Sequence, residues 1–190
     1  PVGEFAYSLT LAAPTVASGA QDVYVTSGLS DQLYVLRNDQ SGGLTADPAQ
    51  AVAVPRGPVF VTTLPASNSH SQQLLVASAA ADQVSVLSRS SKPTAAFERQ
   101  QSVDASSKPL ALALGNFQIT GWPGFAVALN GTDQLDLFVM SGSGEFASAL
   151  ATKQPTSPSP IAVATGRVLP RCAGCKERFD DVVVLSAQDG

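Results

Sequence analysis

The sequence predicts an all-β protein in which one unit of about four strands is repeated along the chain. Three landmarks recur with one spacing: an Asp-Gln pair that begins at Asp31, Asp82 and Asp133, a proline before an apolar run at Pro58, Pro109 and Pro160, and a serine that closes a short strand at Ser27 and Ser78. Each series advances in steps of 51 residues. Three independent landmarks with one period indicate a repeat protein.

Each unit divides into four short apolar runs. In the unit that begins at Pro109 the runs are LALALGNF, GFAVALNG, DQLDLFVM and EFASALAT. They are rich in Val, Leu, Phe and Ala and are separated by Gly, Pro, Ser and Asn, which is typical of strands and turns. Because these turn residues interrupt every candidate helix, no long helix is expected. Four strands at this period predict the blades of a β-propeller.

The predicted blades do not close a ring by themselves. Residues 1–13 contain GEFAYSLTL, which aligns with GEFASALAT, so they are expected to form the outermost strand of a blade. Whole blades are expected at about 14–57, 58–108 and 109–158, and a half blade at 159–190. These are about 3.5 blades. Since open blade edges invite pairing, we expect a protein partner or the remainder of the same propeller to complete the ring.

Composition excludes two classes of partner. The formal net charge is -4, only 14% of the residues are charged, and no run of Lys or Arg occurs. Nothing in the chain therefore attracts a nucleic-acid backbone or an anionic membrane surface. The longest apolar runs, such as PLALALG, are too short to cross a bilayer, so no transmembrane segment is expected.

The recurrent aspartates are interpreted as structural. Asp31, Asp82 and Asp133 stand where the second strand of each unit turns back into the third. A short Asp side chain can accept hydrogen bonds from nearby backbone N–H groups and so fix a turn. A catalytic acid is expected once in a chain and not in every repeat. No catalytic residue is predicted.

The order of strands and turns resembles the FG-GAP/VCBS repeat family. The residues that carry the resemblance are PLALALGNFQITGWPGFAVALNGTDQLDLFVMSGSGEF, with weaker matches in IAVATG, FDDVVVLS and TVASGAQDVYVTS. The family includes the propeller head of integrin α chains and many bacterial surface proteins. The resemblance implies a ring of seven blades, roughly twice the length of this chain.

The same resemblance raises the question of calcium, because family members often hold Ca²⁺ in an Asp-rich loop between the first two strands of a blade. Calcium needs several oxygen ligands, commonly including two or more carboxylates. Here Asn116 stands in place of the leading Asp, and Asp180 and Asp181 alone cannot make a site. We therefore expect no cofactor, and no calcium in the loops at 115–124 and 166–181.

Cys172 and Cys175 lie in CAGCKER, within the longest inserted loop. A local disulfide or a pair of loop thiols is expected first; half of an intermolecular metal site, and a redox or haem role, stay open. A zinc site needs two further ligands, and Lys176 occupies the place of the axial His of a c-type haem. A disulfide would favour an extracytoplasmic compartment.

Two further side chains are weak candidates for ligand binding. His70 is the only histidine, and its neighbours in SNSHSQQ are all polar, so a solvated side chain is expected. Trp122 in TGWPG lies in a loop between strands, where an indole could stack on a sugar or fill a partner's pocket. The alternative is that Trp122 packs against the neighbouring blade.

These observations predict a non-catalytic binding or scaffolding module that engages a protein or a glycan. Its expected place is outside the cell, at the cell surface or in the periplasm. Two alternatives stay open. The chain could be an accessory subunit of a larger complex, possibly a membrane or redox complex, or part of a propeller enzyme whose site lies on the ring axis. The fold alone does not choose among these.

Overall fold

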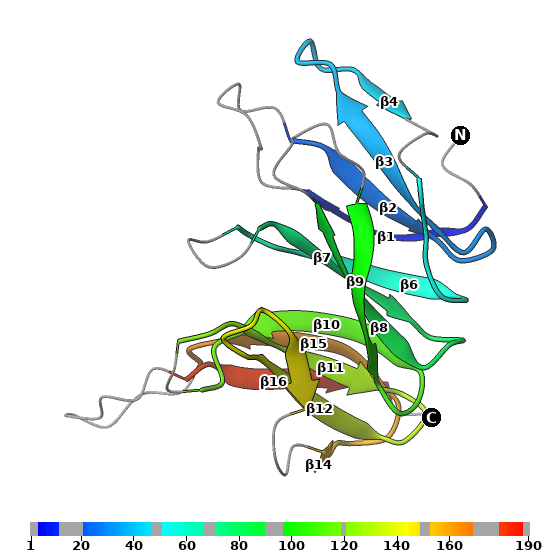
Figure 1. Ribbon diagram of the computed structural model, residues 1–190. Helices are drawn as coiled ribbons and strands as arrows, with labels where there is room; N and C mark the ends of the chain where they lie inside the picture. Colours follow the sequence, from blue (N-terminus) through cyan, green and yellow to red (C-terminus); the bar gives the residue numbers. More distant parts are fainter. Residues whose placement is uncertain are drawn as a thin grey trace. The chain divides into compact units, whose positions relative to one another are not determined.

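The computed structural model describes residues 4–11, 21–46, 51–66, 71–89, 97–118, 121–148, 153–168 and 179–187. Within these ranges every regular element is a strand, and no helix occurs. The strands form four sheets, and all of their pairings are antiparallel (Figure 1). The predicted all-β fold of four-stranded blades is confirmed.

The first sheet has the strand order β1-β2-β3-β4, and the short β5 pairs with the other end of β3. Its strands are β1 (Ala6–Leu11), β2 (Val23–Ser27), β3 (Gln32–Asn38), β4 (Leu44–Ala46) and β5 (Val52–Ala53). Because β4 and β5 both pair with β3, they share the fourth position of the sheet.

The second sheet has the order β6-β7-β8-β9. Its strands are β6 (Pro58–Leu64), β7 (Gln73–Ser78), β8 (Gln83–Arg89) and β9 (Phe97–Asp104). The apolar runs and the turn residues of the sequence therefore fall where the 51-residue period predicts them.

The third sheet repeats the order of the first, and the fourth sheet has two strands. The third contains β10 (Pro109–Gly115), β11 (Gly124–Leu129), β12 (Gln134–Met140), β13 (Phe146–Ser148) and β14 (Gln154–Pro155). The fourth pairs β15 (Pro160–Gly166) with β16 (Asp181–Ser186). By position in their sheets, β1, β6, β10 and β15 are the first strands, β2, β7, β11 and β16 the second strands, and β3, β8 and β12 the third strands.

The expectation that residues 1–13 form an outermost strand was wrong. β1 pairs with β2 and takes the first position of its own sheet. The reason lies in Phe5, which has φ of 56° and accepts a hydrogen bond from the N–H of Gly28. Gly57, Lys108 and Ser159 also have positive φ directly before a first strand and accept the corresponding bond. The segments GEFAYS and GEFASA are therefore similar in sequence but occupy different positions in their sheets.

The chain forms two compact units, residues 1–104 and residues 105–190. In the first unit, one buried apolar cluster joins the first and second sheets. Tyr24, Leu33, Val35 and Val54 come from the first sheet and the segment that follows it, and Val61, Leu74, Val76, Leu87 and Phe97 come from the second. Burial of each large apolar side chain stabilises the fold by about 1.5–3 kcal/mol.

In the second unit, aromatic side chains of the third sheet form a compact group. Phe125 on β11 stacks on its cross-strand neighbour Phe138 on β12, with ring centroids 4.9 Å apart. Phe146 on β13 meets the Phe125 ring edge-on at 5.0 Å. Such pairs add about 0.5–1.5 kcal/mol to the area they bury.

Threonines tie consecutive first strands together within each unit. Thr63 Oγ1 on β6 donates to the carbonyl of Leu11 on β1 at 3.0 Å. In the second unit, Thr165 Oγ1 on β15 makes the corresponding bond to the carbonyl of Leu114 on β10. First strands that lie side by side, with the rest of each sheet extending away from them, are the arrangement of propeller blades.

We expect Leu87→Ala to lower the free energy of unfolding by about 2–5 kcal/mol, since Leu87 is fully buried in the cluster between two sheets. Urea denaturation followed by circular dichroism measures this. Leu44→Ala, at a half-exposed leucine of β4, is the matched control and is expected to change stability little. Equal effects of the two substitutions would contradict the proposed packing.

Candidate functional site

In the first and third sheets, the turn between the second and third strands is joined by hydrogen bonds to the segment that follows the sheet. Asp31 has φ of 51°, its Oδ1 accepts the N–H of Gly57 at 2.9 Å, and its carbonyl accepts the N–H of Val54 at 3.1 Å. Both bonds fix the linker between β5 and β6. The linker therefore enters the next first strand in a defined direction.

Asp133 repeats this arrangement in the second unit. Its φ is 51°, its Oδ1 accepts the N–H of Ser159 at 2.8 Å, and its carbonyl accepts the N–H of Thr156 at 2.9 Å. Asp82 has the same backbone conformation, with φ of 53°. The structure thus places all three aspartates at the same position of successive sheets, in left-handed turns.

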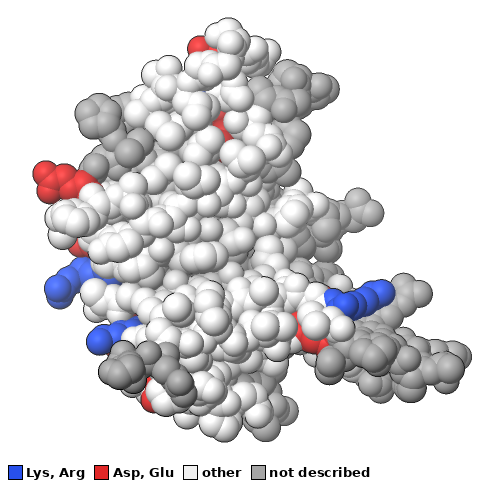
Figure 2. Space-filling model, turned by 180° about the vertical axis from the view of Figure 1, so that it is seen from behind, with Lys and Arg blue, Asp and Glu red and all other residues white. Residues whose placement is uncertain are grey.

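The end of the sheets that carries these turns also presents cationic side chains. In the first unit, Arg56 is exposed in the linker before β6. In the second unit, Lys108 is exposed directly before β10, and Lys153 Nζ donates to Ser106 Oγ at 2.7 Å. Figure 2 shows one face of the molecule, on which described Lys and Arg side chains are few and most of the described surface is uncharged.

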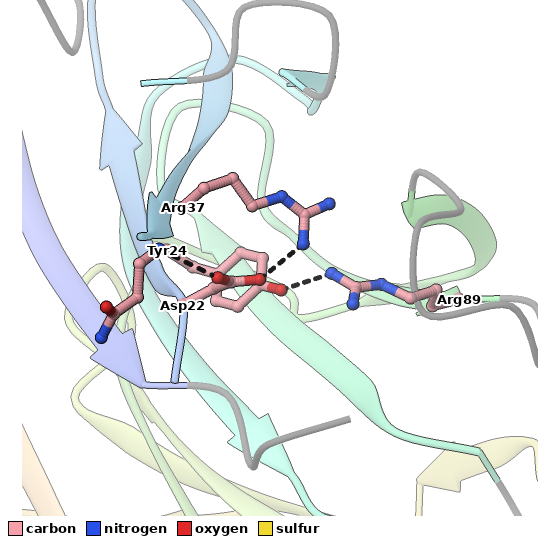
Figure 3. Close-up of polar contacts among 5 residues, drawn as sticks. Asp22, Tyr24, Arg37 and Arg89 are labelled. Carbon is pink, nitrogen blue, oxygen red and sulfur yellow. Dashed lines mark hydrogen bonds and ion pairs between the residues drawn. The ribbon is translucent and has the colours of Figure 1, made fainter. Parts of the chain in front are cut away.

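A polar cluster lies at the opposite end of the strands in the first unit (Figure 3). Asp22, just before β2, accepts from Arg37 Nη1 on β3 at 2.6 Å. The backbone N–H of Asn38 donates to the other carboxylate oxygen at 3.3 Å. This ion pair is partly exposed, so the charge interaction itself contributes only about 0–1 kcal/mol.

The buried half of the cluster joins β2 to the second sheet. Arg89 Nη2 on β8 donates to Tyr24 Oη at 2.5 Å (Figure 3). The Arg89 guanidinium lies 4.4 Å from the ring centroid of Phe97, and Phe97 packs edge-to-face on Tyr24 at 5.3 Å. Tyr24, Arg89 and Phe97 are all buried. The buried cation is thus compensated by a hydroxyl and an aromatic face.

The chemistry open to this cluster follows from its protonation. Burial raises the pKa of Tyr24 above its ordinary value, although the nearby Arg89 opposes the shift. The phenol is therefore protonated at neutral pH and cannot serve as a base. Arg37 and Arg89 are both engaged with partners inside the cluster. We interpret the cluster as a tie between the first and second sheets.

The remaining candidates from the sequence fall in several places. Trp122 is half-buried, and its ring lies close to Gly142, in the turn between β12 and β13 of its own sheet. His70, Cys172 and Cys175 lie outside the described residues.

The acidic residues considered for calcium make backbone hydrogen bonds. Asp180 Oδ2 accepts the N–H of Asn116 at 2.8 Å, and Asp181 Oδ2 accepts the N–H of Val168 at 2.9 Å. Among the described residues, no group of three His, Cys, Asp or Glu side chains is placed to hold a metal ion. None of the described elements is a helix long and apolar enough to cross a membrane.

Sequence reasoning missed the cluster around Tyr24. A signal was available, because Tyr24 stands where the equivalent second-strand positions hold Leu75 and Ala126. Arg89 likewise corresponds to Met140 in the third sheet. Polar residues that replace apolar ones at equivalent positions of a repeat indicate a local exception.

Comparison with known proteins supports the fold and gives no family. No family model matches the chain, and no curated protein does. Among solved structures, a protein assigned as a 6-phosphogluconolactonase from Bacteroides fragilis matches 81% of this chain with a TM-score of 0.62 and 14% identity. The periplasmic gluconolactonase PpgL of Pseudomonas aeruginosa matches 84% of it with a TM-score of 0.60 and 18% identity.

A third similar structure is BBS1N, solved in complex with ARL6DN, which matches 94% of the chain with a TM-score of 0.56 and 10% identity. The matches cover 40%, 42% and 47% of those three chains, so this chain spans less than half the length of each. At such identities the likeness shows the fold alone, and that fold is propeller-like.

These comparisons correct the expected function. We expected a non-catalytic binding or scaffolding module and no enzyme. The similar structures with TM-scores of 0.60 and above are described as lactonases, which are enzymes. The non-catalytic hypothesis was therefore wrong as the main interpretation, and the alternative of a propeller enzyme is better supported. The FG-GAP/VCBS resemblance finds no matching family model, although the propeller that it implied is confirmed.

We expect Tyr24→Phe to lower the free energy of unfolding by about 1.5–3 kcal/mol, because the buried Arg89 guanidinium loses a hydroxyl acceptor. Chemical denaturation measures the loss. Tyr34→Phe on β3 is the matched control, since Tyr34 is only partly buried, and it is expected to have a small effect. If the Tyr24→Phe protein were as stable as the wild type, the hydrogen bond between Tyr24 and Arg89 would not stabilise the contact between the two sheets.

Proposed function

We propose that this chain is part of a propeller enzyme that hydrolyses a lactone of a sugar acid, with the site on the ring axis. The observation that carries the proposal is the shared fold with two lactonases over more than four-fifths of the chain. The first strand of each blade is the strand nearest the axis of a propeller, so the linkers that lead into the first strands also lie close to the axis. The end with the aspartate turns is therefore the place for the site.

In the second unit, this end of the strands carries two lysines, Lys108 and Lys153, beside the turn of Asp133. Water attack on a lactone carbonyl places negative charge on its oxygen, and the product is a carboxylate. Lys108 stands at the start of β10, and Lys153 is held by Ser106. An ammonium group aimed at developing negative charge stabilises the transition state, and the same group attracts an anionic sugar acid or sugar phosphate.

The turn aspartates are unsuited to activate the water. In Asp31 and in Asp133, one carboxylate oxygen accepts a hydrogen bond from a backbone N–H of the linker. These carboxylates are thereby held to the linkers, and we assign them a structural role. We assign Lys108 and Lys153 to binding and charge stabilisation, and we assign water activation to a group on another blade.

The test is hydrolysis of glucono-δ-lactone and of its 6-phosphate by the full-length protein, followed by proton release to a pH indicator. We expect a rate above that of buffer alone, and a decrease in kcat/KM of roughly tenfold or more for the double variant Lys108→Ala, Lys153→Ala. The matched control is Arg167→Ala, an exposed cation just after β15, at the other end of the strands. No hydrolysis above the spontaneous rate would refute the proposal, and an unchanged double variant would refute the roles of the lysines.

We also propose that the repeats are of the FG-GAP/VCBS type. The support is the order of strands in residues 109–146 and the recurrent aspartate turn. A profile built from homologues of the full-length chain should align with FG-GAP/VCBS repeats at the 51-residue spacing. Alignment with the repeats of lactonase propellers in its place would contradict this assignment.

A further inference from the structure

The turn between β11 and β12 carries the only Asn-Gly pair of the chain, Asn130-Gly131. Asn130 directly follows β11, and its N–H donates to the carbonyl of Lys108 at 3.1 Å. The residues directly after the other second strands donate in the same way to the residue before a first strand, and they are Gly28, Ala79 and Ala187. Asn130 is thus the one member of this set with a side-chain amide.

The backbone nitrogen of Gly131 is accessible and unhindered. Gly131 is exposed, and among the described residues its N–H has no hydrogen-bond acceptor. A Cβ at this position would collide with Ser107 Oγ unless that side chain moved, so packing favours glycine here. Because glycine has no side chain, its nitrogen can approach the side-chain carbonyl carbon of Asn130 without steric hindrance.

Long hydrogen bonds hold this turn closed. The N–H of Thr132 donates to the carbonyl of Leu129 at 3.4 Å, and Asn130 Nδ2 donates to the carbonyl of Pro160 at 3.4 Å. Ordinary N–H···O bonds cluster near about 2.9–3.0 Å, so both contacts are weak. A turn that is exposed at Gly131 and Thr132 and weakly bonded can open locally while the strands on either side stay paired.

We propose that Asn130 is a deamidation site of the folded chain and that local opening of its turn permits the reaction. The Gly131 nitrogen attacks Asn130 Cγ and loses its proton, the Cγ–Nδ2 bond breaks, and ammonia leaves. Water then opens the resulting succinimide ring at either carbonyl, which leaves aspartate or isoaspartate at position 130. The sequence of steps consumes only water and involves no oxidation or reduction.

The product weakens the attachment of β15 to the third sheet. Two side chains of the turn bond the start of β15: Asn130 Nδ2 donates to the carbonyl of Pro160, and Asp133 Oδ1 accepts the N–H of Ser159 at 2.8 Å. A carboxylate at position 130 has no N–H for the Pro160 carbonyl and repels its oxygen. Isoaspartate also adds a methylene to the backbone between the bond to Lys108 and the bond from Asp133. The proposal concerns this turn alone and does not depend on lactone hydrolysis.

The test is incubation of the folded 190-residue chain in mildly alkaline buffer, which favours loss of the proton from the attacking nitrogen. Peptide mass spectrometry measures the conversion of each side-chain amide into an acid, and isoaspartyl methyltransferase labels the isoaspartate. Asn130 should convert faster than Asn38 and Asn116, because the residues that follow those two, Asp39 and Phe117, carry side chains. Asn130→Gln, which keeps an amide on a longer side chain, should form no isoaspartate.

Denaturant distinguishes opening of the turn from unfolding of the chain. Urea concentrations below the unfolding transition should change the rate at Asn130 by less than about twofold, because local opening exposes little surface. A rate that rises with urea in step with the unfolded population would overturn the proposal. An intact Asn130 in the folded chain, under conditions in which the urea-unfolded chain converts, would also overturn it, as would earlier conversion of Asn38 or Asn116.

Asn130→Asp tests the consequence for β15. Hydrogen exchange of the β15 amides should become at least about fivefold faster, since the Pro160 carbonyl loses its donor. Asn38→Asp is the matched control: Asn38 Oδ1 accepts the N–H of Gln40 at 2.8 Å, and a carboxylate oxygen can still accept it, so β15 exchange should not change. If Asn130→Asp does not fold, converted wild-type chain, separated by ion exchange, gives the same comparison. Unchanged β15 exchange in the converted chain would refute the weakened attachment.

Discussion

The bond from a turn aspartate to the linker that follows its sheet organises the rest of the fold. Asp31 and Asp133 adopt a left-handed conformation that costs most residues about 1–2 kcal/mol. Each aspartate then holds the linker through its carboxylate and its carbonyl. With the linker fixed, the next first strand starts at a defined place, the threonine ties can form and the apolar faces of the sheets can meet. The aspartate turn is thus the joint on which the packing depends.

Much of the fold could be predicted because the repeat places the same physical demands on each unit. The Asp-Gln turns, the prolines that open β6 and β10, and the short apolar runs locate β6–β12 from sequence alone. The N-terminal strand could not be placed, because the assignment of β1 depends on the φ of Phe5 and on one backbone bond to Gly28. Neither the φ of Phe5 nor this bond can be recognised from the residue types at these positions. Local similarity of letters is weaker evidence than position relative to a linker.

The candidate sites were less predictable, since they depend on departures from the repeat. Tyr24 and Arg89 come from strands of two different sheets and are 65 residues apart, so their contact follows from packing and not from any local motif. Lys153 and Ser106 are likewise 47 residues apart. The expectation of a non-catalytic module came from the lack of a recognisable catalytic arrangement in the sequence. That observation is compatible with an enzyme whose reacting groups are divided among many blades.

The aspartate turn also has a consequence for how such a chain could gain blades by duplication. Its two partners are 26 residues apart in the first unit and again in the second, so the device that attaches a new blade lies entirely within one repeat and the linker after it. A duplication of one 51-residue period therefore copies the sheet together with the hydrogen bonds that join its turn aspartate to the following linker. Gain or loss of whole blades preserves every local contact of the remaining ones, and short-range fastenings also keep contact order low, which favours rapid folding of each added unit.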